Sequence, residues 1–273
     1  MFKALRNAAV KNPPMQTLVR ALSRSGVLPP AIYSRLPVYG QHAVSSPAGN
    51  SFNYVAGAYD LLARSVVWGN LTLWEKASLH AWSRLARTAR RVLDVGAYSG
   101  IYSLIACVDG PADVIAFEPN PEARALLEGN IRANHLAERI TVVQKGASAM
   151  AGTARMHIPA DNTAARVDRH ADGPWVELTT IDEVLAGRSA DLIKIDAEGL
   201  EPDILLGAHL TMAQHHPALI MECLNRASFD ALQSITTSYG YNPIWHLSST
   251  GAKRVRDFVE EPQFANFLWR VDV

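Results

Sequence analysis

Cysteine, net charge and long apolar runs are all scarce in this chain, and each shortage excludes a class of protein. The chain has 273 residues but only two cysteines, Cys107 and Cys223, and no C-x-x-C motif. Isolated thiols of this kind are usually buried and free, so we expect a reducing, cytoplasmic setting. Lys plus Arg number 26, as do Asp plus Glu, and this balance argues against nucleic acid as a partner. No stretch approaches the ~18 apolar residues of a membrane span, so we expect no stable membrane insertion.

The first part of the chain is predicted to be an arm rather than a core. Proline, serine and glycine cluster in NPP, LPP, LPVYG and SSPAGNS, which indicates short helices and loops. The initial stretch MFKALRNAAVKNPPMQTLVRAL is basic but has no continuous apolar core, so it does not predict a signal peptide. We therefore expect residues 1–70 to form an N-terminal helical arm or lid related to substrate binding, and residues 71–273 to form the main domain.

Beyond residue 70, predicted strands alternate with predicted helices. An amphipathic helix over residues 71–90 leads into the first strand. The apolar segments VLDV, DVIAF, ITVV, LIKI and ALIM are typical of strands, and helical segments such as PEARALLEGNIRANHL separate them. This order indicates βαβ units around a mostly parallel sheet, with helices on both faces. The late segments NPIWHL and ANFLWRVD have no helix between them, so we expect them to pair antiparallel at the end of the sheet.

Acidic residues stand at the ends of four of the predicted strands. In open α/β sheets, ligands bind at the carboxyl ends of the strands. One acid at such a position is typical of a solvated loop, but four of them favour a common ligand site. The acids are Asp94, Glu118, Asp196 and Glu222.

The loop in RVLDVGAYSGIYSLIA has too few glycines for a dinucleotide. A G-x-G-x-x-G motif starting at Gly96 would need glycine where Tyr98 and Ile101 stand, and no P-loop motif is present. The pattern is D-x-G-x-x-x-G, formed by Asp94, Gly96 and Gly100. A cofactor without a pyrophosphate needs fewer glycines, which suits S-adenosylmethionine. Tyr98 stands where a residue that tolerates positive φ is expected.

The motifs DVGAYSGIYSLIA, AFEPNP, N-x-x-x-N, TIDEVL, LIKIDAEGLEPDILLGA and PALIMEC follow one another between Val92 and Cys223. In this order they resemble the FkbM family of S-adenosylmethionine-dependent methyltransferases, in which asparagine is usual at position 98. The resemblance implies a class I methyltransferase (Rossmann-like) α/β fold with a seven-stranded sheet whose last strand is antiparallel. It also implies methylation of hydroxyl groups on sugars, polyketides and other natural products.

The cofactor-binding residues are predicted from the motifs together with this resemblance. Glu118 follows Gly96 at the interval at which an acid reaches a ribose diol. The turn Gly146–Ser148 would lie near adenine, and Glu75 matches an acid that the family often has upstream. The full predicted set is Glu75, Asp94, Gly96, Tyr98, Gly100, Glu118, Pro119, Asn120, Ala147 and Asp196.

Methyl transfer to a hydroxyl requires that the hydroxyl be made electron-rich, and KIDAEG offers the residues for this. Lys194, Asp196 and Glu198 alternate, so they share one face if the strand continues. In one mechanism Asp196 or Glu198 acts as a general base. In another, Asp196, Glu198 and Glu222 hold Mg²⁺, which prefers oxygen ligands. A third interpretation gives Glu198 and Glu222 only a loop-ordering role.

The sequence therefore predicts an S-adenosylmethionine-dependent O-methyltransferase acting on a sugar, glycoside or oligosaccharide, with a polyketide or other secondary metabolite as the next acceptor class. An NAD-dependent oxidoreductase and a non-catalytic nucleoside-binding module are the alternatives of other classes. The polar segment from His157 to Trp175 is expected to be a long loop that covers the acceptor or faces solvent. The acceptor is a small molecule or an oligosaccharide, and a homo-oligomer is left open.

Overall fold

An eight-stranded sheet forms the centre of the computed structural model, which describes residues 12–57, 61–71, 75–159, 165–168, 172–261 and 265–271. Five neighbouring strands are parallel, as the alternation of strands and helices predicted. From edge to edge the strands are β13 (Gly251–Val255), β12 (Ile244–Ser248), β14 (Asn266–Trp269), β11 (Ala218–Glu222), β10 (Leu192–Ile195), β3 (Arg91–Val95), β4 (Asp113–Phe117) and β5 (Ile140–Val143).

The late strands β12 and β14 pair antiparallel, as expected, but β13, which the sequence did not predict, lies between them in the chain. Strand β14 lies between β11 and β12, and Ile244 of β12 stands opposite Trp269 of β14. The seven expected strands are thus present, and β13 extends the sheet as an eighth by forming a hairpin with β12. The side chains of β13 are mostly exposed, so its sequence, GAKRV, lacks the apolar run that identified the other strands.

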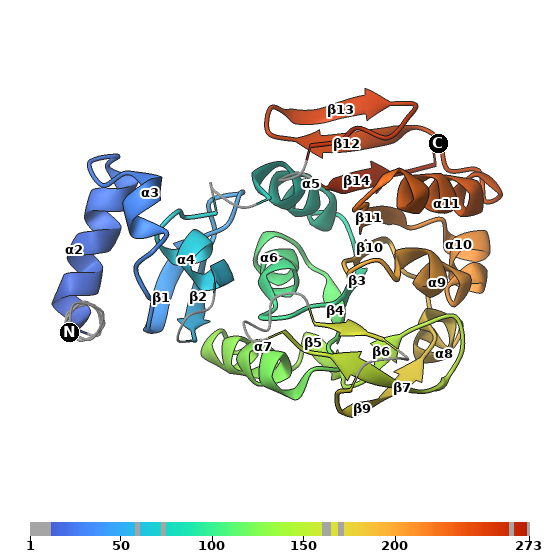
Figure 1. Ribbon diagram of the computed structural model, residues 1–273, viewed down its shortest axis with the longest axis horizontal. Helices are drawn as coiled ribbons and strands as arrows, with labels where there is room; N and C mark the ends of the chain where they lie inside the picture. The colour runs from blue at the N-terminus through green and yellow to red at the C-terminus, as the bar shows by residue number, and fades with distance from the viewer. Residues whose placement is uncertain are drawn as a thin grey trace.

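Helices cover both faces of the sheet (Figure 1), and the five parallel strands contribute side chains to both. On one face Val92 and Ile220 pack with α5 (Lys76–Ala86), α6 (Ile101–Asp109) and α7 (Pro121–Ala133). On the other face Leu93 and Leu219 belong to a second core. The helices of that face are α8 (Ile181–Leu185), α9 (Glu201–Leu206), α10 (His209–His215) and α11 (Arg226–Thr237). Burial on both faces explains the continuous apolar runs of the parallel strands.

The N-terminal arm contains a β-hairpin that the sequence analysis missed. Helices α2 (Pro13–Arg24), α3 (Pro30–Tyr33) and α4 (Leu61–Val67) confirm that short helices are present. Strands β1 (Gly40–Ser45) and β2 (Ser51–Ala56) form the hairpin, in a stretch interpreted as loops. Alternate β2 side chains are buried and join the core of α6 and α7, so this hairpin packs directly on the main domain (Figure 1).

A second, smaller sheet borders the expected long loop, and one of its strands lies within that segment. It has the order β6 (Gly146–Ala147), β9 (Trp175–Thr179), β7 (Gly152–His157) and β8 (Arg166–Val167). The segment from His157 to Trp175 was interpreted as wholly irregular, and β8 corrects this. Residues 160–164 and 169–171 of that segment lie outside the described residues. Within the described ranges, no helix has the length and apolar character needed to cross a membrane.

The two asparagines of the N-x-x-x-N motif fasten β2 to α7. The Val55 N–H donates to Asn130 Oδ1 at 2.6 Å, and the Asn130 amide donates to the Ser99 carbonyl at 2.8 Å. Asn134 accepts from the Asn53 N–H and donates back to its carbonyl, both at 2.7 Å. Backbone groups away from water need such partners, so the motif joins the arm to the loop that follows β3.

We expect Asn130→Ala to lower the free energy of unfolding by about 2–3 kcal/mol, because it leaves the Val55 N–H and the Ser99 carbonyl without their side-chain partner inside the protein. Urea unfolding followed by circular dichroism would measure the change. Arg132→Ala, an exposed position on the same helix, is the matched control and should change stability by less than about 0.5 kcal/mol. Equal effects of the two substitutions would contradict this role of Asn130.

Candidate functional site

The backbone of the loop between β3 and α6 requires glycine at position 96 and holds Tyr98 in a left-handed conformation. Gly96 has a φ of +80°, and a Cβ atom there would lie 1.9 Å from the Asp196 carbonyl oxygen. No side chain fits, so the loops after β3 and β10 touch through their backbones. Tyr98 adopts a φ of +48°, the left-handed conformation expected at this position. Gly100, with a φ of +84°, caps α6.

Asp94 orders this loop through hydrogen bonds to Ser103. Its Oδ2 accepts hydrogen bonds from the Ser103 N–H at 2.9 Å and from the Ser103 hydroxyl at 2.6 Å. Only 1% of Asp94 is exposed, and burial raises its pKa to about 6, against the lowering effect of Ser103. A carboxylate at the first turn of α6 also faces the positive end of the helix dipole. Asp94 therefore orders the loop as well as bordering the cavity above it.

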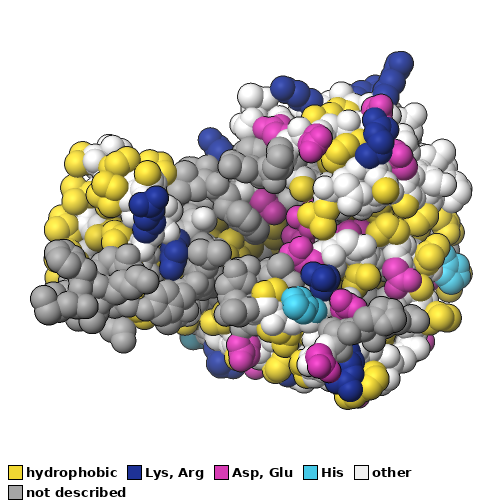
Figure 2. Space-filling model, viewed as in Figure 1, with side chains coloured by type: hydrophobic (Ala, Val, Ile, Leu, Met, Phe, Trp, Pro, Cys, Tyr) yellow, Lys and Arg dark blue, Asp and Glu magenta, His cyan; other side chains and the backbone are white. Residues whose placement is uncertain are grey.

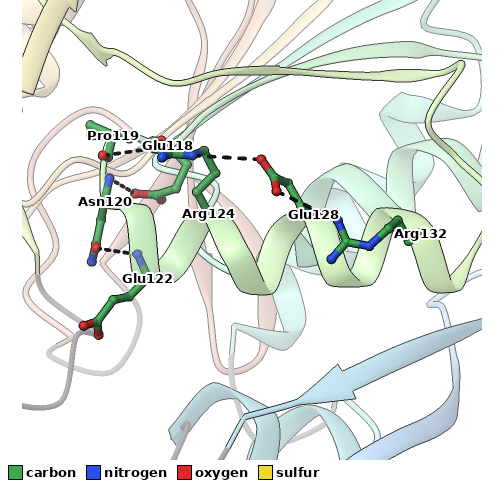
Figure 3. A network of polar contacts seen from close by, with 7 residues as sticks. All are labelled: Glu118, Pro119, Asn120, Glu122, Arg124, Glu128 and Arg132. Carbon is green, nitrogen blue, oxygen red and sulfur yellow. Dashed lines mark hydrogen bonds and ion pairs between the residues drawn. The ribbon is translucent and has the colours of Figure 1, made fainter.

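Glu118 projects from the end of β4 and is held by two backbone amides, of which that of Asn120 is drawn in Figure 3. Its Oε2 accepts from the Tyr98 N–H at 2.7 Å and its Oε1 from the Asn120 N–H at 2.9 Å. Burial raises the pKa of Glu118 to about 7, although both amides lower it. Each carboxylate oxygen can accept a further hydrogen bond, so the group is oriented while retaining capacity for a ligand with two hydroxyls.

The start of α7 is ordered by a second set of contacts around Glu118. Asn120 caps the helix by accepting from the Glu122 N–H at 3.1 Å, and Pro121 fits its first turn. The Arg124 guanidinium donates to the Glu118 and Pro119 carbonyls, at 3.5 and 3.4 Å. Arg124 also begins a chain of ion pairs through Glu128 to Arg132 along the helix (Figure 3). The AFEPNP motif thus forms a rigid corner.

These residues border a cavity of about 390 Å³ at the carboxyl ends of the parallel strands. Acidic side chains are visible in the hollow at the centre of Figure 2. Ten of the predicted site residues line the cavity: Glu75, Asp94, Gly96, Tyr98, Glu118, Asn120, Lys194, Asp196, Glu198 and Glu222. Gly100, the N-cap of α6, is not among the lining residues. Pro119 and Ala147 line an adjoining hollow that shares Gly96, Glu118 and Asp196 with the main cavity.

The one lysine in the lining, Lys194, is buried and paired. Its Nζ lies 2.8 Å from Asp196 Oδ2, and 1% of its side chain is exposed, against 25% for Asp196. The ammonium also lies 5.0 Å from the centroid of the Tyr102 ring, as a cation–π contact. Burial lowers the pKa of Lys194, but the charges of Asp196 and Glu75 outweigh it and raise the pKa overall. Lys194 is therefore a fixed positive charge rather than a base.

Three carboxylates meet beside this ion pair. Oxygen atoms of Asp196, Glu198 and Glu222 all lie within 4.8 Å of one another. Strand β10 ends at Ile195, so Glu198 is not on a continuing strand face; a left-handed turn at Glu198, with a φ of +56°, brings it in. Burial and the charge of Asp196 raise the pKa of Glu222 to about 9. Glu222 Oε2 is buried and has no hydrogen-bond partner among the described residues.

Seven lining residues were missed by the sequence analysis, and Tyr102, Leu62 and Ser65 are the polar or arm-derived ones among them. Tyr102 donates its hydroxyl to Glu75 and packs edge-on against Trp82, with ring centroids 5.2 Å apart. Burial raises the pKa of Glu75. Leu62 and Ser65 come from α4 in the arm. Tyr102 directly follows the glycine loop, in GIYSL, so its place in the motif could have indicated a role at the site. The sequence of α4 has no pattern that connects it to the cavity.

The sheet order and the acidic cavity together define the class of protein. The order β5-β4-β3-β10-β11-β14-β12, with only β14 reversed, is that of the class I methyltransferases. Six acids and one lysine line the cavity, which favours a cationic ligand such as S-adenosylmethionine. The chain thus has the class I methyltransferase fold. The family model of the methyltransferase FkbM domain matches residues 94–261, more than half of the 273 residues, so the chain belongs to this family.

Two of the solved structures that are similar to this chain are described as methyltransferases. Methyltransferase FkbM from Methylobacillus flagellatus KT is 21% identical, with a TM-score of 0.49 over 79% of this chain and 55% of that one. An S-adenosylmethionine-dependent O-methyltransferase from Thermotoga maritima is 14% identical, with a TM-score of 0.45 over 85% and 78% of the two chains. This chain thus spans about half of the Methylobacillus protein. The comparison with curated proteins gave no match.

Proposed function

We propose that the protein transfers the methyl group of S-adenosylmethionine to a hydroxyl group of a sugar, glycoside or oligosaccharide. The observation that carries the proposal is the cluster of Lys194, Asp196, Glu198 and Glu222 directly beside the glycine loop. A cofactor in contact with that loop would face this cluster. Carboxylates that converge on one point can both orient an acceptor hydroxyl and take its proton.

The cofactor fits the residues around the loop. Glu118 offers two fixed carboxylate oxygens to the ribose hydroxyls, and the absence of a side chain at Gly96 lets the loop after β3 pack against the Asp196 backbone at the edge of the cavity. When bound, S-adenosylmethionine supplies a methyl group on a positively charged sulfur, which becomes a neutral thioether as the methyl carbon bonds to the acceptor oxygen. The surplus of carboxylates attracts this positive charge and loses part of that attraction once the charge is gone, which favours product release.

Asp196 is the proposed proton acceptor for the hydroxyl. Lys194 holds one of its oxygens at 2.8 Å, so the orientation of the carboxylate is fixed, and the side chain is partly open to the cavity. The proton that the acceptor loses moves to Asp196, whose negative charge is thereby neutralised. Glu222 is less suited as a base at neutral pH, because a pKa of about 9 leaves it protonated there.

The acceptor is proposed to lie between the carboxylate cluster and the arm. Leu62 and Ser65 of α4 bring an apolar and a hydroxyl group to the cavity wall. We therefore assign residues 1–70 a lid function over the domain formed by residues 71–273. Hydroxyl-rich acceptors match the many carboxylate oxygens, because each can accept a hydrogen bond from a sugar hydroxyl. A polyketide or other secondary metabolite with adjacent hydroxyls is the second acceptor class.

A divalent cation also fits the cluster. The unpartnered, buried Oε2 of Glu222 and the close approach of three carboxylates are features of a site for a hard cation. Asp196, Glu198 and Glu222 would hold Mg²⁺, which would lower the pKa of an acceptor hydroxyl as a Lewis acid. Lys194 already neutralises part of Asp196, so the cation would rely mainly on the two glutamates.

We expect Glu118→Gln to weaken binding of S-adenosylhomocysteine by roughly 10–100-fold, because charge-assisted bonds to the ribose are lost. Ribose hydroxyls donate to the ionised carboxylate, so cofactor binding favours proton loss from a group whose pKa is about 7. Wild-type affinity should therefore fall as the pH drops below about 7, and the variant should lack this dependence. Calorimetry would measure both. Glu122→Gln is the control and should behave as wild type. A wild-type pH dependence that persists in Glu118→Gln would refute the ribose assignment.

We expect Asp196→Asn to reduce kcat by about 10²–10⁴-fold, the range for loss of a general base. Asparagine still offers Lys194 a hydrogen-bond acceptor, so the protein should remain folded, as a thermal unfolding curve would show. Asp230→Asn, at an exposed position on α11, is the control for loss of a carboxylate. Turnover of Asp196→Asn at the wild-type rate with any accepted glycoside would sink the proposed role.

For the cation site, we expect Mg²⁺ to raise the melting temperature of the wild type and not of Glu222→Gln, since a ligand that binds only the folded state stabilises it. A shift of roughly 2–4 °C per kcal/mol of binding is expected for a domain of this size. Activity after chelation by EDTA should return when Mg²⁺ is added. An unchanged melting temperature together with full activity in EDTA would leave Asp196 acting without a cation.

A further inference from the structure

A second groove lies on the other side of α5 from the candidate site. It has a volume of about 550 Å³ and runs between α5 and the turn from β12 to β13, with Pro47 of the β1–β2 turn at its edge. Figure 1 shows α5 beside these two strands. The groove shares no lining residue with the candidate site. Lys76 lines the groove, whereas Glu75, the residue before it, lines the candidate site.

The charge of this groove is opposite to that of the candidate site. Its lining contains no aspartate or glutamate, and four exposed basic side chains follow one face of α5: Lys76, His80, Arg84 and Arg87. None of these four has an ion pair among the described residues. In a chain of zero formal net charge, a concave surface on which the charges of Lys76, Arg84 and Arg87 are not neutralised is the electrostatic complement of an anion.

Two carboxylates lie close behind the groove, and both are engaged. Asp109 accepts from the hydroxyls of Ser83 and Ser46 and from the Asn50 amide. Glu261 accepts from the Ser249 N–H at 3.4 Å and lies 3.9 Å from the His246 ring. Asp109 is held by three hydrogen bonds and Glu261 by one, and neither is among the residues that line the groove. The arginines therefore stay available to an occupant of the groove.

The opposite wall supplies small polar groups. Ser249, Thr250 and Gly251 form the turn from β12 to β13, with the Ser248 hydroxyl donating to the Gly251 carbonyl at 2.8 Å. Gly251 has a φ of +111°, which keeps the turn tight. A wall of hydroxyls facing guanidinium groups is a combination that recognises phosphate oxygens, because arginine binds them in a bidentate manner and hydroxyls add further donors.

The length of the basic face indicates more than one anionic group. From Lys76 to Arg87 the helix rises by roughly 16 Å, which exceeds a single phosphate. We propose that this groove binds a small molecule with two or more linked phosphate groups, the class that includes nucleoside diphosphates and diphosphate-linked sugars. The inference rests on the groove alone and is independent of the proposed methyl transfer.

Inorganic pyrophosphate is the probe for the test, and isothermal calorimetry at about 0.15 M salt, where separated surface charges are screened, is the measurement. We expect saturable binding to the full chain that weakens by about tenfold or more in Arg84→Gln/Arg87→Gln, since bonds between charged groups are lost. Arg35→Gln/Arg132→Gln removes the same charge from exposed positions outside the groove and should bind as wild type. Saturating S-adenosylhomocysteine should leave the pyrophosphate affinity unchanged.

Three outcomes would overturn the proposal. The first is no binding of pyrophosphate by the wild type. The second is an equal loss of affinity in both double variants, which would indicate general charge attraction. The third is binding to vesicles of anionic phospholipid, measured by sedimentation, without binding to free pyrophosphate or ADP, which would assign the basic face to a lipid surface. Thermal unfolding of each variant would confirm that the comparison is made between folded proteins.

Discussion

The buried ammonium of Lys194 is the charge on which the arrangement of the site depends. An unpaired ammonium in the interior would be costly, since burial removes its water. Asp196 lies at hydrogen-bond distance, the Tyr102 ring offers its face, and Glu75 adds a second negative charge held by the same tyrosine. These contacts come from β10, α6 and the residue before α5. Because one cation requires all of them, the three elements are fixed relative to one another at the carboxyl ends of the strands.

Acids outnumber this cation, and the surplus gives the cavity its chemical character. Glu222 has a raised pKa, and one of its oxygens has no hydrogen-bond partner among the described residues. Burial raises the pKa of Glu118 to about 7, although two amide donors lower it. Groups in this condition respond strongly to an arriving ligand, because a small change in their surroundings changes their protonation. Helix α5 separates this region from the basic groove, so residues adjacent in sequence, Glu75 and Lys76, face sites of opposite sign.

Much of the fold and part of the site could be predicted because they depend on strong local signals. Continuous apolar runs such as LIKI revealed the parallel strands, and the acids after them marked the edge where the cavity lies. The hairpin β1–β2 and strand β13 escaped because many of their side chains are exposed or half-exposed, so they lack those runs. The convergence of Glu198 on Asp196 depends on a left-handed turn, and the contribution of α4 depends on long-range packing. Neither leaves a pattern in adjacent residues.

The attachment of β2 to α7 has a consequence for how the arm can change. Asn130 accepts a hydrogen bond from the Val55 N–H, and Asn134 bonds to the N–H and the carbonyl of Asn53. All residues except proline have both of these main-chain groups. The side chains of β2 take no part in these particular bonds. The Asn53 side chain adds one bond of its own, to the Ala133 carbonyl at 3.1 Å. Substitutions at the other outward-facing positions of the hairpin therefore leave these main-chain bonds in place, so the arm can be remodelled while its register against the main domain is kept.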